Sequence, residues 1–180
     1  MKKATLVCLL VGVCFCALAS LAADDFVVCQ STYALCTGAK CAPVPGKKDT
    51  VSCSCDVKSG YSVGQQPCQE VKQTGEGQQI KSRYFPIKSY QACSNSRPWA
   101  WCLDKECVVD KKDPSKAECA CTLVKDQGTW VIVTDTYHKS ACTTGIVSSA
   151  TVTQDHEITD FLKDNDLLKP FPVTVLNGEK

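Results

Sequence analysis

Histidine is scarce in this sequence, and so are the motifs that accompany metal-dependent or phosphate chemistry. The 180 residues include two histidines, His138 and His156, and neither lies in a recognisable catalytic or metal-binding motif. The chain has no His-Glu-x-x-His and no phosphate-binding loop. Its acidic residues are dispersed among lysines, as is typical of a solvated surface. The sequence therefore predicts a non-catalytic protein, with no catalytic residues, no cofactor and no metal site.

Long hydrophobic runs are absent after the first 22 residues. A positive start, Lys2 and Lys3, precedes an apolar run over residues 6–21, and small residues at positions 20 and 22 suit a cleavage site. This pattern predicts a cleaved signal peptide over residues 1–22. A membrane anchor is the alternative, but the run is short for a span of about 20 apolar residues. We expect a secreted or periplasmic protein whose mature part has no membrane span.

A strong excess of charge is also lacking. Residues 1–22 contain two of the 20 basic residues and no acidic one, so 18 basic and 19 acidic residues remain after them. A near-neutral balance gives no reason to expect nucleic acid or anionic lipid as a partner. The expected partner is a protein or a glycan, and no nucleic acid.

Cysteine is abundant, by contrast. Three of the 15 cysteines lie in residues 1–22, which leaves twelve, an even number, in a chain expected to be exported. That context favours disulfides over metal ligation. The two Cys-x-Cys pairs, at residues 53–55 and 119–121, also have one intervening residue, whereas zinc sites commonly use two to four. We expect six disulfides and no free thiol.

The twelve cysteines fall into two sets with matching spacing. The three central spacers are 4, 11 and 1 residues in both sets, and the outer spacers are 6 and 12 in the first set and 8 and 20 in the second. Matching spacers indicate a tandem duplication. The sets are Cys29, Cys36, Cys41, Cys53, Cys55, Cys68 and Cys93, Cys102, Cys107, Cys119, Cys121, Cys142.

The predicted fold class is small, disulfide-rich and mainly β, with two tandem hairpin-based six-cysteine modules plus a short C-terminal helix. After the signal peptide at 1–22, the expected segments are the first module at 23–69, a linker and strand at 70–92, the second module at 93–142, and a cysteine-free tail with the short helix at 143–180.

Each module is expected to contain one hairpin. In the first, residues 51–57 form a strand and residues 58–60 a turn; in the second, residues 117–124 pair with residues 129–137. Residues i and i+2 of a strand share a face, so the two cysteines of a Cys-x-Cys pair cannot easily bond to each other. Each of them should therefore reach a different loop.

The linker and the tail carry further local signals. Residues 74–77 predict a turn, and residues 80–90 a strand broken at Pro86. Residues 155–168 predict a helix capped by Thr153 or Asp155. Its apolar stripe should dock on the second module, because such a stripe is too large to leave in water. The stripe consists of Ile158, Phe161, Leu162 and Leu168.

The first cysteine set resembles the epidermal-growth-factor-like module. The order Cys-x6-Cys-x4-Cys-x11-Cys-x-Cys-x12-Cys and Gly60-Tyr61 after Cys55 carry the resemblance. The second set lacks Gly-Tyr and has a longer last spacer, and the family's calcium-binding pattern is not matched. The resemblance implies bonds between the first and third, second and fourth, and fifth and sixth cysteines of each set. The implied pairs are Cys29–Cys41, Cys36–Cys53, Cys55–Cys68, Cys93–Cys107, Cys102–Cys119 and Cys121–Cys142.

Two short segments combine arginine with aromatic residues, which are enriched in the energetically important parts of interfaces. The candidate binding surface consists of Arg83, Tyr84, Phe85, Arg97, Trp99 and Trp101. A place in the core is favoured over an interface for these residues, because a small module has few large apolar residues and a tryptophan packed on a disulfide is ordinary core.

The expected function is an exported, disulfide-stabilised binding protein that is not an enzyme and whose partner the sequence does not identify. The alternative is a secreted protease inhibitor or effector that acts through a rigid loop, such as residues 42–46.

Overall fold

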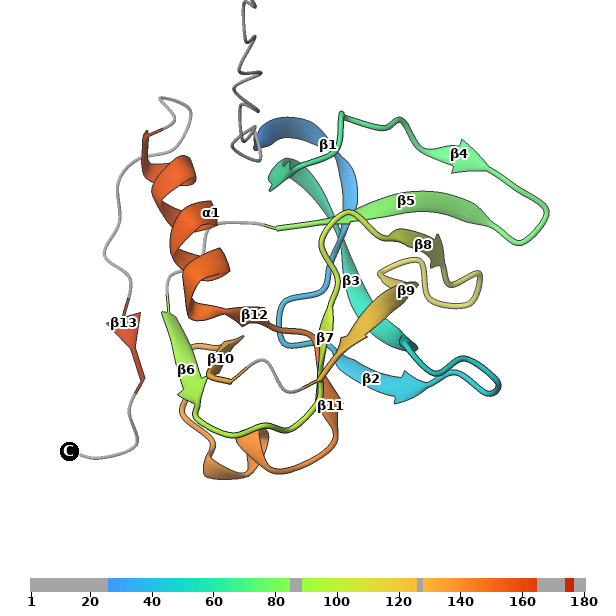
Figure 1. Ribbon diagram of the computed structural model, residues 1–180. Coiled ribbons are helices and arrows are strands. Elements are labelled where there is room, and N and C mark those ends of the chain that lie inside the picture. Colours follow the sequence, from blue (N-terminus) through green and yellow to red (C-terminus); the bar gives the residue numbers. More distant parts are fainter. Residues whose placement is uncertain (1–25, 85–88, 126–127, 165–173, 177–180) are drawn as a thin grey trace, which may run out of the picture.

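The chain forms two β-sheets and one α-helix in the residues that the computed structural model describes, which are 26–84, 89–125, 128–164 and 174–176 (Figure 1). The fold is thus small, mainly β and disulfide-rich, as predicted. The strands are β1 (Val27–Leu35), β2 (Lys40–Pro43), β3 (Thr50–Gly64), β4 (Lys72–Gln73), β5 (Gln78–Arg83), β6 (Ser89–Cys93), β7 (Trp99–Trp101), β8 (Glu106–Val109), β9 (Lys116–Val124), β10 (Trp130–Val133), β11 (Ile146–Val147), β12 (Ala150–Thr151) and β13 (Thr174–Val175); the helices are η1 (Lys139–Cys142), a 3₁₀ turn, and α1 (Val152–Asp164).

Five strands of the larger sheet form a closed ring. Strand β1 pairs with β3, β3 with β9, β9 with β8 and β8 with β5, all antiparallel. The short parallel pairing of β5 with β1 completes the circuit. Closure pairs backbone groups that would otherwise stand at sheet edges. The ring takes strands from both cysteine sets, so the two expected modules share one sheet.

The ring is arranged about the pairing of β3 with β9. Cys53 lies opposite Cys119 in this ladder. Strand β2 flanks β3 and places Cys41 opposite Cys53, and β8 flanks β9 and places Cys107 opposite Cys119. The first residues of β2 and β8 are 66 apart (40 and 106), as are those of β3 and β9 (50 and 116). The local topology is therefore the same around both cysteine sets.

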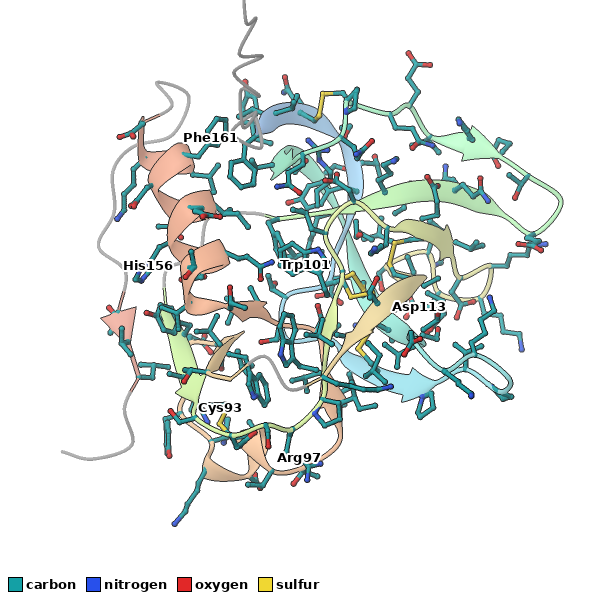
Figure 2. All side chains as sticks on the ribbon, viewed as in Figure 1. Cys93, Arg97, Trp101, Asp113, His156 and Phe161 are labelled. Atoms are coloured by element: carbon teal, nitrogen blue, oxygen red, sulfur yellow. A yellow bond between two sulfur atoms is a disulfide. The ribbon has the colours of Figure 1, made fainter. Side chains whose placement is uncertain are left out.

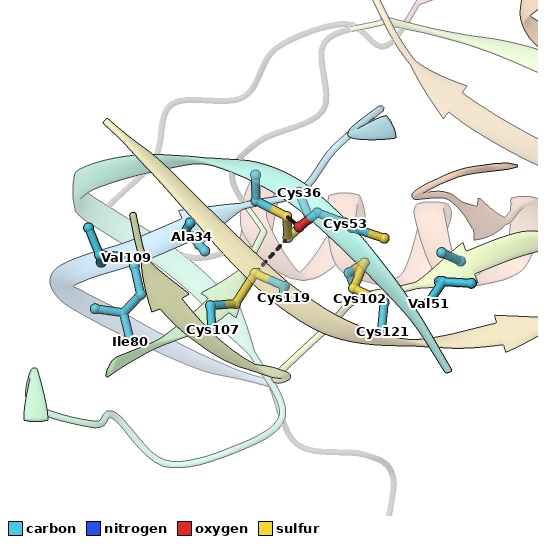
Figure 3. Close-up of a cluster of buried hydrophobic side chains, with 13 residues drawn as sticks. Ala34, Cys36, Val51, Cys53, Ile80, Cys102, Cys107, Val109, Cys119 and Cys121 are labelled. Atoms are coloured by element: carbon cyan, nitrogen blue, oxygen red, sulfur yellow. Dashed lines mark hydrogen bonds between the residues drawn. A yellow bond between two sulfur atoms is a disulfide. The ribbon is translucent and has the colours of Figure 1, made fainter. Parts of the chain in front are cut away.

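Sulfur fills the interior of the ring (Figure 3). The buried cluster consists of Ala34, Cys36, Val51, Cys53, Cys55, Ile80, Ala100, Cys102, Cys107, Val109, Ala117, Cys119 and Cys121. The sulfur of Cys36, from the first set, lies 3.5 Å from that of Cys119, from the second. Disulfides of the two sets thus touch one another and serve as the core in place of large aliphatic side chains.

All twelve cysteines after residue 22 are paired, and every bond stays within its own set, as predicted. The pairing is nested: first with sixth, second with fifth and third with fourth. The observed bonds are Cys29–Cys68, Cys36–Cys55, Cys41–Cys53, Cys93–Cys142, Cys102–Cys121 and Cys107–Cys119.

The pairs implied by the epidermal-growth-factor-like resemblance are therefore wrong. These are Cys29–Cys41, Cys36–Cys53, Cys55–Cys68, Cys93–Cys107, Cys102–Cys119 and Cys121–Cys142. The physical reason is the register of β2 on β3, which puts Cys41 directly opposite Cys53 with their Cα atoms 4.0 Å apart. Cys55, on the same face of β3, is then left for Cys36. The expectation that the members of each Cys-x-Cys pair reach different segments is confirmed.

Both predicted hairpins are wrong. Strand β3 runs through residues 58–60 without turning, because β1 pairs along its second half from Asp56 to Gly64. In the second set, β10 does not return along β9. It joins the smaller sheet, of order β12-β10-β6-β13, where Trp130 lies opposite Cys93. Short-range signals identified the strands but assigned the wrong neighbours.

Helix α1 closes one open side of the ring (Figure 1). It spans Val152–Asp164, and its cap is Thr151 rather than Thr153 or Asp155. The Gln154 amide donates to Thr151 Oγ1 at 3.2 Å, and the Thr151 amide donates to Gln154 Oε1 at 2.9 Å, a reciprocal capping box. Ile158 and Leu162 are buried, so the helix docks as predicted, but not on the second module alone.

The surface on which α1 docks belongs to both halves of the chain. Ile158 and Leu162 pack with Val63 of the first set, Tyr84 of the linker and Leu103 of the second set. Leu168 lies outside the described residues, as do Phe85, Pro86 and residues 1–22. The turn at 74–77 is confirmed, since Thr74 and Gly77 exchange backbone hydrogen bonds. Helix α1 is too short to cross a membrane, and no other helix in the described ranges could do so.

The nested pairing makes a specific prediction for peptide mapping. Digestion of the unreduced protein with a protease that cleaves after lysine should place Cys36 and Cys41 on different peptides, because Lys40 lies between them. Both peptides should remain linked to the peptide that holds Cys53 and Cys55. Fragmentation between Cys53 and Cys55 should then assign Cys41 to Cys53 and Cys36 to Cys55. Linkage of Cys29 to Cys41 would contradict the observed register.

Candidate functional site

A wide cleft lies where the first cysteine set meets the end of the second. Its volume is about 710 Å³. The floor is largely apolar, with Ile132 buried and Ala141, Ile146 and Val147 half-buried. Lys40, His138, Ser140 and Thr144 supply an exposed polar rim. A largely apolar cleft with a few polar groups around it is the usual form of a ligand-binding site.

The walls of the cleft are held by strand pairing and by disulfides. Strand β11 pairs with β2, with Ile146 opposite Cys41. Cys41 is bonded to Cys53 on one wall, and Cys142, at the end of η1, is bonded to Cys93 on the other. These bonds limit how far the walls can separate.

The third support of the cleft is the buried side chain of Gln91. Its Oε1 accepts from the backbone amide of His138 at 2.9 Å, and its Nε2 donates to the carbonyl of His138 at 2.9 Å. One fully buried amide thus fixes the backbone of the exposed rim residue His138. No sequence pattern indicates this contact, because the two residues are 47 positions apart.

The polar side chains of the cleft include a histidine and a serine. His138 and Ser140 both line it, but no hydrogen bond joins them within the described residues. A serine nucleophile needs a base within hydrogen-bonding reach. The arrangement can bury an apolar group and contact it with exposed polar side chains.

Of the tryptophans proposed as a binding surface, Trp99 belongs to the core. It is 2% exposed and packs with Cys93, Trp130 and Ile132. Trp101 is half-buried, and its ring meets that of Trp99 edge-on, with centroids 6.4 Å apart. Trp99 and Trp101 share one face of β7, which points inward at Trp99. The core place favoured for Trp99 is therefore confirmed, and its place in the candidate binding surface is corrected.

Arg83 and Tyr84 are also core residues, and their assignment to a binding surface is corrected. The Arg83 guanidinium donates to Asp104 Oδ1 at 2.9 Å, to the carbonyls of Gln66 and Val27, and to the sulfur of Cys29. This buried ion pair joins the linker strand to both cysteine sets. Burial lowers the pKa of Arg83, and Asp104 opposes that shift.

Tyr84 is 4% exposed, and burial raises its pKa above the usual range. Its hydroxyl lies 3.4 Å from the carbonyl oxygen of Ser149, to which it donates. Phe85 lies outside the described residues. Arg97 is exposed, at the periphery of the molecule, while Trp101 lies between α1 and the ring (Figure 2).

A second, smaller pocket of about 180 Å³ lies beside Trp101. Its lining combines apolar groups from both sheet and helix with amide and carboxylate side chains. The residues are Phe26, Gln65, Trp101, Leu103, Gln154, Glu157 and Ile158. Of the six residues proposed as a binding surface, Trp101 lines this pocket.

Two groups of cysteine sulfurs have the spacing of a metal site. Cys36, Cys102 and Cys121 form one group and Cys36, Cys55 and Cys119 the other, with all sulfurs of a group within 4.8 Å of one another. Every one of these sulfurs is in a disulfide. A metal would require thiolates, so these groups are packing contacts between disulfides.

One Gly-x-Ser-x-Gly pentad, residues 60–64, is present in the chain. In hydrolases this pattern places a serine on a sharp turn between a strand and a helix. Here it lies inside β3, with Ser62 opposite Cys29 in the ladder and 2% exposed. An extended strand does not present the hydroxyl as a turn would, so the pentad is structural.

The most unusual titratable group is Asp155, in the first turn of α1. Its carboxylate is fully buried, and neither oxygen has a hydrogen-bond partner among the described residues. Burial raises its pKa from 3.8 to about 6, and His156 opposes that shift. The charge of Asp155 in turn raises the pKa of Tyr84 and Tyr90, after burial. The ionised carboxylate therefore weakens the docking of α1.

Comparison with known proteins finds no matching family model, no matching curated protein and no matching solved structure. Function is therefore inferred from the geometry of this chain.

Asp155 makes stability depend on pH. A folded-state pKa near 6 against an ordinary 3.8 means that folding favours the protonated form. The stability that the raised pKa of Asp155 contributes to the folded state is fully present below about pH 4, and it is lost as the pH rises through about 6. Asp155→Asn should therefore stabilise the protein at pH 7.5 by on the order of 2 kcal/mol, and the difference from the native chain should vanish near pH 4. Thermal unfolding of both chains across this range measures it. A pH-independent difference would contradict the assignment.

Proposed function

We propose that this protein is an exported, non-catalytic binding protein whose partner occupies the cleft between the two cysteine sets. The observation that carries the proposal is the largely apolar cleft of about 710 Å³. Its volume falls in the range of known ligand sites, and its position at the junction of two structural halves is a frequent one for such sites. Disulfides in both walls reduce the entropy lost on binding.

Export is supported by the chain itself. Six disulfides are typical of proteins that fold in an oxidising compartment. The charged start and apolar run of residues 1–22 suit a signal peptide. Both features favour a secreted or periplasmic location.

A tandem duplication explains why the cleft lies where it does. The two cysteine sets have the same central spacers, the same nested pairing and strands offset by 66 residues. The second copy departs from the first after its Cys-x-Cys pair, where β10 leaves the ring for the smaller sheet. The longer last spacer of that copy ends in residues 138–141, which line the cleft together with residues 144–147 after Cys142.

A filling substitution tests the proposal. Thr144 is exposed and lines the cleft, whereas its neighbour Thr143 is exposed and does not. Peptides selected from a random library on the native protein should bind the Thr144→Trp variant about tenfold or more weakly, because the indole occupies the cleft. They should bind the Thr143→Trp variant as they bind the native protein. Affinities are measured by calorimetry, after circular dichroism has shown that both variants fold.

Equal binding to both variants would exclude the cleft as the binding site. Failure to select any peptide that binds the folded protein would count against a peptide-like partner.

The second candidate function is protease inhibition by residues 42–46. Ala42 and Pro43 are exposed at the end of β2, and Pro45 and Gly46 are exposed in the connection to β3. The Cys41–Cys53 bond closes the base of this segment. A stapled, proline-containing loop is preorganised for binding in an enzyme cleft. Inhibition of any member of a protease panel that is lost on reduction, and retained by Thr144→Trp, would favour this function over the first.

A further inference from the structure

The pocket beside Trp101 has one wall that is almost wholly apolar. Trp101 and Phe26 are half-buried and line it, together with the buried side chains of Leu103 and Ile158. The indole of Trp101 is held by edge contact with Trp99 and by a tilted contact with Tyr84, whose ring centroid is 5.8 Å away. The π face of an indole is electron-rich and attracts polarised C–H groups.

The other wall is polar. Gln65 and Glu157 are exposed, and Gln154 is half-buried. The capping box uses Gln154 Oε1, which accepts from the Thr151 amide, and so leaves the Gln154 Nε2 group to donate to a ligand. Glu157 can only accept hydrogen bonds when ionised, and Gln65 can do both. Donors and acceptors therefore face the apolar wall across a small volume.

We propose that this pocket binds a single pyranose ring at the end of a neutral or amino-sugar glycan. A pyranose has an apolar face of C–H groups, which suits Trp101, and a rim of hydroxyls, each both donor and acceptor, which suits the two glutamines and Glu157. The pocket volume of about 180 Å³ fits one ring rather than an extended chain.

Charge restricts the sugar further. Glu157 is the only ionisable residue among the described residues that line the pocket. A carboxylate disfavours an anionic ligand at close range and favours a cationic one. The pocket therefore selects against uronic acids and accepts neutral hexoses and hexosamines. This site is separate from the cleft described above, which takes its residues from 38–41, 132 and 138–147.

The backbone that carries Trp101 is rigid, so little ordering is required on binding. Trp101 lies in β7 opposite Thr122 of β9, and the next residue, Cys102, is bonded to Cys121. On the helix side, the capping box fixes Gln154. Preorganised groups of this kind lose less conformational entropy when they bind a ligand.

The tryptophans provide an internal reporter. Trp99 and Trp130 are each 2% exposed, and Trp101 is half-buried, so a ligand in the pocket changes the fluorescence and acrylamide quenching of Trp101 alone. Titration with methyl β-glucopyranoside, N-acetylglucosamine and glucosamine should protect Trp101 from quenching, with Kd on the order of 1 mM. Glucuronate should not. In saturation-transfer NMR, the hydrogens on one face of the bound ring should receive the most saturation.

Matched variants separate this pocket from other parts of the surface. Gln65→Ala should weaken binding about tenfold, the effect expected for one lost hydrogen bond, whereas Gln66→Ala, next to it and outside the pocket, should leave Kd within about twofold. Glu157→Gln should retain binding of the neutral sugars and allow glucuronate to bind.

Three results would overturn the proposal. One is the absence of both quenching protection and saturation transfer for all the neutral and amino sugars at concentrations well above 1 mM. Another is an equal loss of binding in the Gln65→Ala and Gln66→Ala variants. The third is stronger protection of Trp101 by adenosine than by any sugar, which would assign the pocket to flat aromatic ligands. Each result is independent of whether Thr144→Trp blocks the cleft.

Discussion

The contact between disulfides of the two halves, inside the ring of five strands, is the constraint on which the rest of the structure depends. The chain offers few large aliphatic residues there, and the sulfur atoms of both sets fill the space instead. Cys53 lies opposite Cys119, and the nested bonds fasten β2 to β3 and β8 to β9. Each bond limits the unfolded chain and adds buried volume, so a thin core becomes stable.

Both candidate sites are consequences of that arrangement. The ring brings residues 38–41 and 138–147 together at one border, where the cleft forms, and leaves an open side that α1 covers. The docking of α1 over Trp101 leaves the small pocket at its edge. The same docking buries Asp155, whose carboxylate has no hydrogen-bond partner among the described residues. The apolar contacts of Ile158 and Leu162 offset this energetic cost.

Local chemistry was predictable where one short segment decides the outcome. Alternation along a strand settled that the members of each Cys-x-Cys pair bond elsewhere, and the turn at Thr74–Gly77 and the apolar stripe of α1 followed from the same short-range rules. Thr151 and Gln154 have capping-box spacing, so the helix cap could also be predicted from a short segment. The prediction of Thr153 or Asp155 overlooks that spacing. The hairpins were wrong because β-formers identify a strand and say nothing about which distant strand pairs with it.

The sequence by itself determined the class of this protein: twelve cysteines in two matched sets, six bonds within those sets, a mainly β fold and one amphipathic helix. Only the tertiary structure decided the nested pairing, the shared ring, the burial of Arg83, Tyr84 and Trp99, and the cleft beside His138. The reason is that these features rest on contacts between residues far apart in the chain. Cysteine spacing restricts how segments can be joined, but the register of β2 on β3 and of β3 on β9 selects one arrangement among many.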